Sequence, residues 1–204
     1  MYHINANALD GIPLFRDDVD RLTYLELLID QARRSRWTVF SYTLMSTHFH
    51  LLLRLQETTL SSGFHRLQSV YARRYNRRHR RRGVVWQKRF HSELVDSERH
   101  LYEAIRYDAL NAPRASLCIA AEDWPWCFYG VTIGARGRDP LIDEGELLAL
   151  FGRDRDVARR RLRAYVEEAD PRERWRQTTL RRLSDAAVTP SAAKRRRREG
   201  AHSR

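Results

Sequence analysis

Hydrophobic residues recur along this chain with two spacings, and the two spacings predict helices and strands. Apolar residues at helical spacing follow Asp17 and Asp18, so a helix is expected to begin there and to run to about residue 32. Residues 37–45 and 48–55 are predicted strands, and the short break at Ser46 and Thr47 makes them a hairpin. Residues 2–8 form a short mixed segment that ends at a turn signal, Asp10-Gly11.

The helical spacing returns further along the chain. We expect helices over residues 59–78 and 97–111, the second ending before Pro113 because proline disfavours helical backbone in the residue before it. Residues 84–86 are a predicted short strand or ribbon between these helices, and a helical region follows Pro140. This order of elements predicts an α+β sandwich in which helices pack against a mainly antiparallel sheet.

The composition narrows the functional class. The net charge is +12 with a pI of about 10.4, and arginine dominates the excess, which indicates nucleic acid as the first candidate partner and an anionic membrane as the second. No apolar run approaches the roughly 20 residues that span a bilayer, so membrane function is excluded. Cys118 and Cys127 have no C-x-x-C spacing and no signal peptide is indicated, so a cytoplasmic, nucleoid-associated protein is expected rather than a disulfide scaffold.

Two histidines stand two residues apart in the second hairpin strand. Alternate side chains of a strand point to the same face, so His48 and His50 are expected to lie side by side with Phe49 on the opposite face. Two neutral imidazoles in this arrangement suit one divalent cation. Taken alone, however, such a pair on a half-buried strand is more often packed or partly solvated than bound to metal.

A basic stretch follows at the end of the predicted helix 59–78. Residues 71–91 contain nine Lys or Arg and no acid, a density that neutralises phosphates. The candidate DNA-binding residues are Arg73, Arg74, Arg77, Arg78, Arg80, Arg81, Lys88 and Arg89. Four rings interleave with them, and unpaired bases are expected to stack on these rings: Tyr71, Tyr75, Trp86 and Phe90. The competing interpretation is a solvated helix face above ordinary core aromatics.

Tyr107 and Asn111 lie one helical turn apart on the predicted helix 97–111, so both side chains emerge from one face. A tyrosine hydroxyl can act as a nucleophile, and a metal held by two histidines and an amide oxygen can polarise a phosphate for it. Tyr102 is a rival nucleophile, but it lies about 140° around the helix at 3.6 residues per turn and has Arg106 one turn later.

Several separate motifs resemble, in the same order, one known family. They are Tyr2-His3-Ile4, Ile12-Pro13-Leu14-Phe15, Leu44 to Leu52 around the histidine pair, Tyr75 to His79, Gly83 to Phe90, Ile105-Arg106-Tyr107 through Asn111, Asp123-Trp124-Pro125-Trp126, and Leu147 to Gly152. Over roughly residues 2–170 the chain resembles the single-tyrosine transposases with a histidine-hydrophobe-histidine motif, specifically the REP-associated tyrosine transposase branch.

The resemblance implies a ferredoxin-like α+β core that cuts and rejoins single-stranded DNA at hairpin-forming repeats. It implies that His48, His50 and Asn111 bind Mg²⁺ or Mn²⁺ and that Tyr107 forms a 5′-phosphotyrosine linkage, releasing a 3′-hydroxyl. The chain departs from the family pattern in two places near the site. Ser46-Thr47 replaces the usual Pro-Asn before the first histidine, and the proline after Asn111 is shifted by one residue.

Two other functions are considered beside this one. A catalytically inactive DNA- or RNA-binding protein on the same fold would show the same basic and aromatic surfaces. A zinc hydrolase is disfavoured, because the sequence offers no obvious third His, Cys or carboxylate ligand and no glutamate base.

The expected organisation is a catalytic domain over residues 1–135, a basic helical extension over 136–183 and a disordered basic tail over 184–204. The expected partner is single-stranded or hairpin DNA. The sequence is compatible with a monomer and with a homodimer. It leaves open whether one subunit supplies both the histidines and the tyrosine of a site or whether a dimer completes each site.

Overall fold

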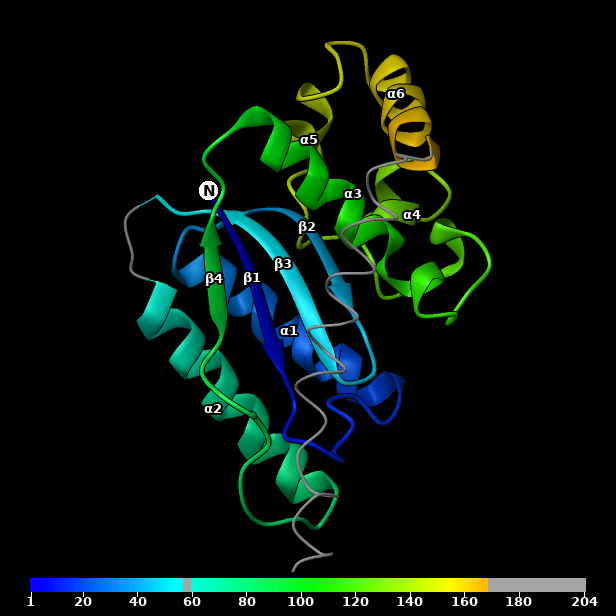
Figure 1. Ribbon diagram of the computed structural model, residues 1–204. Helices are drawn as coiled ribbons and strands as arrows, with labels where there is room; N and C mark the ends of the chain where they lie inside the picture. The colour runs from blue at the N-terminus through cyan, green and yellow to red at the C-terminus, as the bar shows by residue number, and fades with distance from the viewer. Residues whose placement is uncertain (57–59, 169–204) are drawn as a thin grey trace, which may run out of the picture. The chain divides into compact units, whose positions relative to one another are not determined.

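The order of elements in the structure is that of a ferredoxin-like core. The computed structural model describes residues 1–56 and 60–168. The first six elements are β1 (Tyr2–Asn7), α1 (Asp18–Arg34), β2 (Thr38–Leu44), β3 (His48–Arg54), α2 (Leu60–Arg78) and β4 (His91–Leu94). The strands form one antiparallel sheet in the order β2-β3-β1-β4 (Figure 1), which confirms the predicted α+β class.

The predicted hairpin forms with the predicted break. β2 pairs with β3 so that Thr43 lies opposite His50 and Leu44 opposite Phe49. β1 completes the centre of the sheet by pairing with the other side of β3, where Asn5 lies opposite His50. Each strand therefore presents alternate residues to the two faces, and the histidines of β3 share a face with their cross-strand partners.

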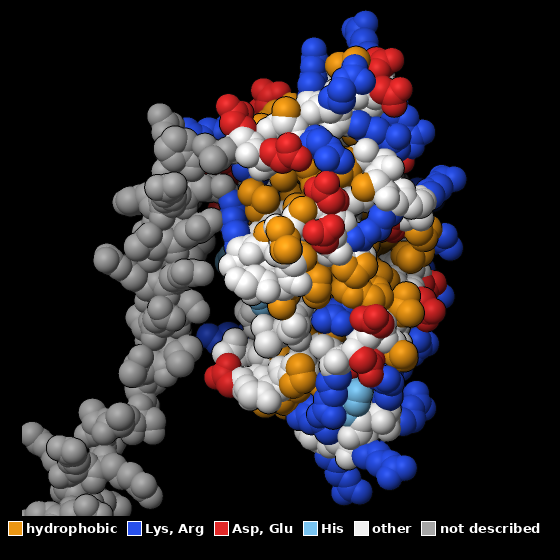
Figure 2. Space-filling model, turned by 90° about the vertical axis from the view of Figure 1, so that its right-hand side faces the viewer, with side chains coloured by type: hydrophobic (Ala, Val, Ile, Leu, Met, Phe, Trp, Pro, Cys, Tyr) orange, Lys and Arg blue, Asp and Glu red, His pale blue; other side chains and the backbone are white. Residues whose placement is uncertain are grey.

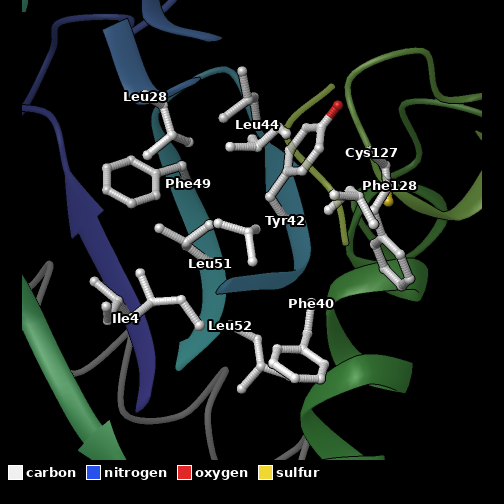
Figure 3. Packing of buried hydrophobic residues seen from close by; sticks show 14 of the residues in the cluster. Ile4, Leu28, Phe40, Tyr42, Leu44, Phe49, Leu51, Leu52, Cys127 and Phe128 are labelled. Atoms are coloured by element: carbon white, nitrogen blue, oxygen red, sulfur yellow. The ribbon is translucent and has the colours of Figure 1, made fainter. Parts of the chain in front are cut away.

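One face of the sheet is covered by α1 and α2. Asp17 caps α1 by accepting a hydrogen bond from the backbone of Asp20. The ring of Phe49 lies 5.1 Å from that of Tyr24 on α1 and 6.4 Å from that of Phe64 on α2, measured between ring centroids. Leu28 and Phe49 lie next to each other on this side of β3 (Figure 3). The hydrophobic core is thus continuous between the sheet and these two helices.

The opposite face carries α3 (Glu98–Arg114), which packs against β2 and β3. Its buried stripe includes Ile105 and Ala109, as the helical spacing indicates. The predicted end of this helix before Pro113 is wrong by one turn. Proline removes only one backbone donor there, and the backbone amides of Ala115 and Leu117 still close the last turn onto Asn111 and Ala112.

One further expectation about the sheet is met only in part. The predicted strand at residues 84–86 is reduced to one antiparallel bridge between Trp86 and Ala8, at which the backbone amides of Leu9 and Gln87 donate to Val85 and Asn7. The fourth strand lies later, at β4, where all four residues are exposed. A strand without a buried face shows no hydrophobic alternation, so the sequence pattern gave no sign of it.

The remaining described elements are η1 (Ala121–Asp123), α4 (Tyr129–Thr132), α5 (Glu144–Ala149) and α6 (Arg155–Glu167). Residues Met1–Val166 form one compact unit. The C-terminal helices are present as expected, while the division of the chain at residue 135 stays a prediction. Residues 169–183 of the predicted extension and the whole predicted tail, 184–204, lie outside the described residues. Within the described part, no helix is long and apolar enough to cross a membrane.

Candidate active site

His48 and His50 lie together on the face of the sheet that α3 covers. Their ring centroids are 5.1 Å apart and the rings are nearly perpendicular. His50 is 7% exposed and His48 is half-buried. Burial is the main cause that lowers the pKa of both imidazoles, and for His50 the lowering is large. Both rings are therefore neutral at pH 7, the state in which an imidazole nitrogen can bind a metal.

α3 brings Tyr107 and Asn111 to the same place. The ring of Tyr107 meets that of His50 edge-on, with centroids 5.0 Å apart. Asn111 is 9% exposed and hydrogen-bonds both to His48 and to the Tyr107 hydroxyl. The structure thus brings together all four residues that the sequence singled out, and it does so within one chain.

Asn111 affects the pKa of both of its neighbours. It raises the pKa of His48, against the lowering caused by burial. Burial raises the pKa of Tyr107, and the interaction with Asn111 opposes this increase. Asn111 is therefore a polar neighbour that the histidine pair and the Tyr107 hydroxyl share.

The donors at this site fit a divalent cation. Within the described part of the chain, the buried Nδ1 of His50 has no hydrogen-bond partner, an unusual state for a polar atom in a protein interior. The neighbouring donors are a second neutral imidazole and an amide oxygen, which are ordinary ligands for Mn²⁺ and, in the case of the oxygen, for Mg²⁺. The Nδ1 of His50 can therefore serve as a metal ligand beside the His48 imidazole and the Asn111 amide.

A second group of potential ligands shares His50. His3, His50 and Asp108 place one ligand atom each within 4.8 Å of one another. The His3 ring stacks on that of His50 at 5.5 Å and meets Tyr107 edge-on at 6.0 Å. However, Nε2 of His3 already lies 2.9 Å from Oδ1 of Asp108. These two side chains partner each other, so they flank the His48–His50 pair without an open position of their own.

Asp108 joins the helix of Tyr107 to two strands. It is 0% exposed, and its second oxygen accepts a 2.6 Å hydrogen bond from the Ser41 hydroxyl on β2. Burial opposes protonation of His3, but the neighbouring Asp108 carboxylate outweighs it and raises the pKa of His3. Sequence reasoning missed His3, Ser41 and Asp108 as site residues. Their pairings span 105 and 67 positions, and no local pattern marks contacts of that range.

Tyr102 lies on another side of α3, away from this cluster. Its hydroxyl donates to the backbone oxygen of Leu150, and its ring packs against Phe151 and Tyr165. The geometric expectation that Tyr102 points away from Tyr107 is confirmed. Tyr102 serves to pack α3 against the C-terminal helices.

The predicted DNA-binding arginines gather at the C-terminal end of α2 and in the loop that follows. Figure 2 shows Lys and Arg side chains gathered at the lower end of the molecule, where Figure 1 places the end of α2. The loop reaches the sheet beside the histidine pair, because the backbone of Gln87 donates to Asn7, which lies opposite His48. Lys88 and Arg89 follow Gln87 directly. Arg78 differs from the others, since it forms ion pairs with Asp17 and Asp20.

The aromatic residues of this region do not face solvent. Tyr71, Tyr75 and Trp86 are buried, and all three donate hydrogen bonds to backbone oxygens. The expectation that bases stack on these rings is therefore wrong for them. Phe90 is half-buried and packs on Phe64 at 4.7 Å. For Tyr71, Tyr75 and Trp86, the part of the competing interpretation that makes them ordinary core aromatics is correct.

Comparisons with known proteins point in one direction. Residues 1–107 match the family model described as "Transposase IS200 like". A solved structure described as "Structure of the REP associates tyrosine transposase bound to a REP hairpin" is similar in fold, with a TM-score of 0.56 and 15% identity. That similarity covers 69% of this chain and 82% of the other. No curated protein sequence matches the chain.

Proposed function

The chain belongs to the IS200-like transposase family and is a DNA-binding transposase, and from this premise we propose that it cuts and rejoins single-stranded DNA with Tyr107 as the nucleophile. One observation carries the proposal: a single amide, Asn111, contacts both His48 and the Tyr107 hydroxyl. A tyrosine that only filled space would not need its hydroxyl beside two neutral imidazoles. The matched range, 1–107, contains both histidines and the tyrosine.

The proposed cofactor is Mg²⁺ or Mn²⁺, held by His48, His50 and the Asn111 oxygen. Such an ion, when bound, neutralises charge on the phosphate oxygens and makes the phosphorus more electrophilic. The unpartnered nitrogen of His50 is common to this ligand set and to the group of His3, His50 and Asp108. The first set is favoured because His3 and Asp108 are already hydrogen-bonded to each other. His3 and Asp108 instead hold α3 in place beside the histidine pair.

In the proposed reaction, the Tyr107 oxygen attacks the phosphorus of a phosphodiester and loses its proton to solvent. The bond from phosphorus to the 3′ oxygen breaks, so that oxygen leaves, takes up a proton and becomes a free 3′-hydroxyl. The strand segment on the 3′ side of the break stays attached to Tyr107 through its 5′-phosphate. Attack by a strand's 3′-hydroxyl reverses the bond changes and releases the tyrosine, so the chemistry consumes no nucleotide.

Asn111 has a defined role in the attack. Burial raises the pKa of Tyr107, which disfavours the phenolate that attack requires. The amide N–H of Asn111 donates to the phenol oxygen and so stabilises negative charge as it forms there. The same hydrogen bond fixes the direction of the hydroxyl relative to His48 and His50.

The proposed DNA contacts are Arg73, Arg74, Arg77, Arg80, Arg81, Lys88 and Arg89, with Arg78 contributing less because two carboxylates neutralise it. The expected substrate is a single strand, or a hairpin with a single-stranded flank. The backbone contact between Gln87 and Asn7 supports this proposal, because it brings the basic loop to the strand end at which His48 stands.

The test uses a pool of end-labelled, hairpin-forming single-stranded oligonucleotides with randomised flanks, incubated with Mn²⁺. We expect a covalent protein–DNA adduct that survives denaturing electrophoresis. Tyr107→Phe should abolish the adduct while DNA binding persists. Tyr102→Phe is the matched control and should form adduct normally, because its hydroxyl bonds to Leu150.

Two outcomes would contradict the assignment. An adduct that persists in Tyr107→Phe would show that another residue is the nucleophile. Binding of the same oligonucleotides by the unaltered protein, without any adduct in Mn²⁺ or Mg²⁺, would favour the non-catalytic DNA-binding alternative.

A further inference from the structure

A groove that the proposed reaction does not use lies where β2 begins. Two cavities of about 910 and 310 Å³ share the wall residues Trp37, Thr38, Pro140 and Leu141. We refer to these joined cavities as the β2 groove. The larger one is bounded by β2 and by the segment from Arg136 to α6, and the smaller one by the C-terminal end of α1. α5 lies beside the start of β2 (Figure 1), where Ile142 bridges to Val39.

Arginine is the dominant charged residue of the β2 groove. Its arginines are Arg33, Arg36, Arg136, Arg138, Arg153, Arg155 and Arg159, against three acids, Asp139, Asp143 and Glu144. The acids are already occupied. Asp139 accepts from Tyr42, Asp143 caps α5, and Glu144 pairs with two of the arginines.

Three arginines are left without a protein partner. Within residues 1–56 and 60–168, the side chains of Arg33, Arg138 and Arg153 make no hydrogen bond or ion pair, and all three are exposed. Arg33 lines the smaller cavity, and Arg138 and Arg153 line the larger one, so positive charge from three segments faces the groove and attracts an anion. The planar guanidinium binds phosphate through two parallel hydrogen bonds, so phosphate is the anion that this arrangement fits best.

The groove and the proposed active site lie near opposite ends of β2. Thr38, in its wall, is five residues before Thr43, which stands opposite His50. At about 3.3 Å per residue the two positions are roughly 17 Å apart along β2. The basic loop after α2 meets the sheet at the other end of the strands, beside Asn7 and His48. The proposed catalytic residues thus lie between two basic regions.

We infer that the β2 groove binds the phosphates of the single DNA strand that flanks the cleaved position. This inference rests on the proposed function, since it assigns the groove to the same substrate strand. The loop after α2 would hold the DNA segment on one side of the attacked phosphodiester. Arg33, Arg138 and Arg153 would hold the segment on its other side.

The test compares two oligonucleotides, one that ends two nucleotides beyond the cleaved position and one that extends eight nucleotides further. The altered protein is Arg138→Ser/Arg153→Ser. The control is Arg160→Ser, which removes one positive charge, half of what the double variant loses, from α6 at a position that lines neither cavity. Thermal unfolding of each variant establishes that the fold is kept.

We expect the unaltered protein and Arg160→Ser to bind the longer strand at least tenfold more tightly than the shorter one. The double variant should lose this gain. For the longer strand, the slope of the logarithm of the binding constant against the logarithm of the salt concentration should decrease in magnitude by about 1.4. Each phosphate contact of a single strand contributes about 0.7, and the double variant removes two such contacts. The rate of adduct formation on the shorter strand should stay unchanged.

Equal gains from the longer strand in the double variant and in the control would overturn the inference. This test of the groove is independent of the test of Tyr107 as the nucleophile. If no adduct forms but the double variant still loses the gain from the flank, the groove binds DNA and the proposed chemistry fails. If adduct forms and the gain is unaffected, the chemistry stands and the groove has no part in holding the strand.

Discussion

Asp108 is a buried carboxylate whose pairing with Ser41 can be measured directly. We predict that Ser41→Ala and Asp108→Ala are strongly non-additive in their effects on the free energy of unfolding. Both side chains are 0% exposed, and the hydrogen bond between them is 2.6 Å long. Removing either partner leaves the other buried, without the bond and out of reach of water.

The magnitude follows from these contacts. Ser41→Ala removes a hydrogen bond to a charged group and should cost about 1.5–3 kcal/mol, since His3 remains as the second partner of the carboxylate. Asp108→Ala leaves the Ser41 hydroxyl unsatisfied, at about 1–3 kcal/mol, and adds a small cavity. The double variant has no orphaned hydroxyl, so its loss should be smaller than the sum of the single losses by about 1–3 kcal/mol.

The assay is urea unfolding of the four proteins, followed by tryptophan fluorescence and circular dichroism. A control cycle combines Ser41→Ala with Arg34→Ala, whose side chain pairs with Asp30 and shares no partner with Ser41. The control cycle should be additive within about 0.5 kcal/mol. If the Ser41–Asp108 cycle is equally additive, the carboxylate does not anchor α3 to β2 as the structure indicates.

Two further predictions concern stability. Gly63→Ala should destabilise the protein by about 1–3 kcal/mol in urea unfolding, although alanine favours helices, because the new Cβ would lie 2.4 Å from the Trp37 ring; a gain in stability would show that the ring moves aside freely. Burial raises the pKa of Glu144, but hydrogen bonds from Arg155 and Arg159 outweigh this effect and hold the pKa below 4.5. The stability that these ion pairs contribute is therefore present above pH 4.5 and is lost as the pH falls through the pKa of Glu144 in the folded protein. The hydrogen-exchange protection factors of α5 and α6, which are corrected for the intrinsic pH dependence of exchange, should therefore be steady from pH 7 to 5 and fall below 4.5. An equal fall in Glu144→Gln would contradict this.

Local periodicity was sufficient to predict most of the elements that build the site. The strand period places His48 and His50 on one face, and the helical period places Tyr107 and Asn111 on one face, and both placements are confirmed. That the two faces meet could not be read from either period. It depends on α3 packing across β2 and β3, a contact between segments that are far apart in the chain.

The errors have local causes as well. Tyr71 and Tyr75 were assigned to DNA because arginines surround them, yet they are spaced four apart and fall on the buried stripe with Phe64, Leu67 and Gln68. The position of β4 was missed because its residues carry no alternation of buried and exposed side chains. The roles proposed for the metal ligands, the nucleophile and the arginines stay predictions.

β4 has a consequence for how the proposed nucleophile is held. The strand leads directly into the helix of Tyr107, but it contributes no buried side chain and is joined to the sheet by its pairing with β1. Segments of this kind open locally at little free-energy cost. The helix beyond it is fixed separately, by Ile105, Ala109 and the buried Asp108. β4 therefore leads into α3 without holding that helix in place. The edge of the sheet that β4 forms can open, or pair with another strand, without displacing Tyr107.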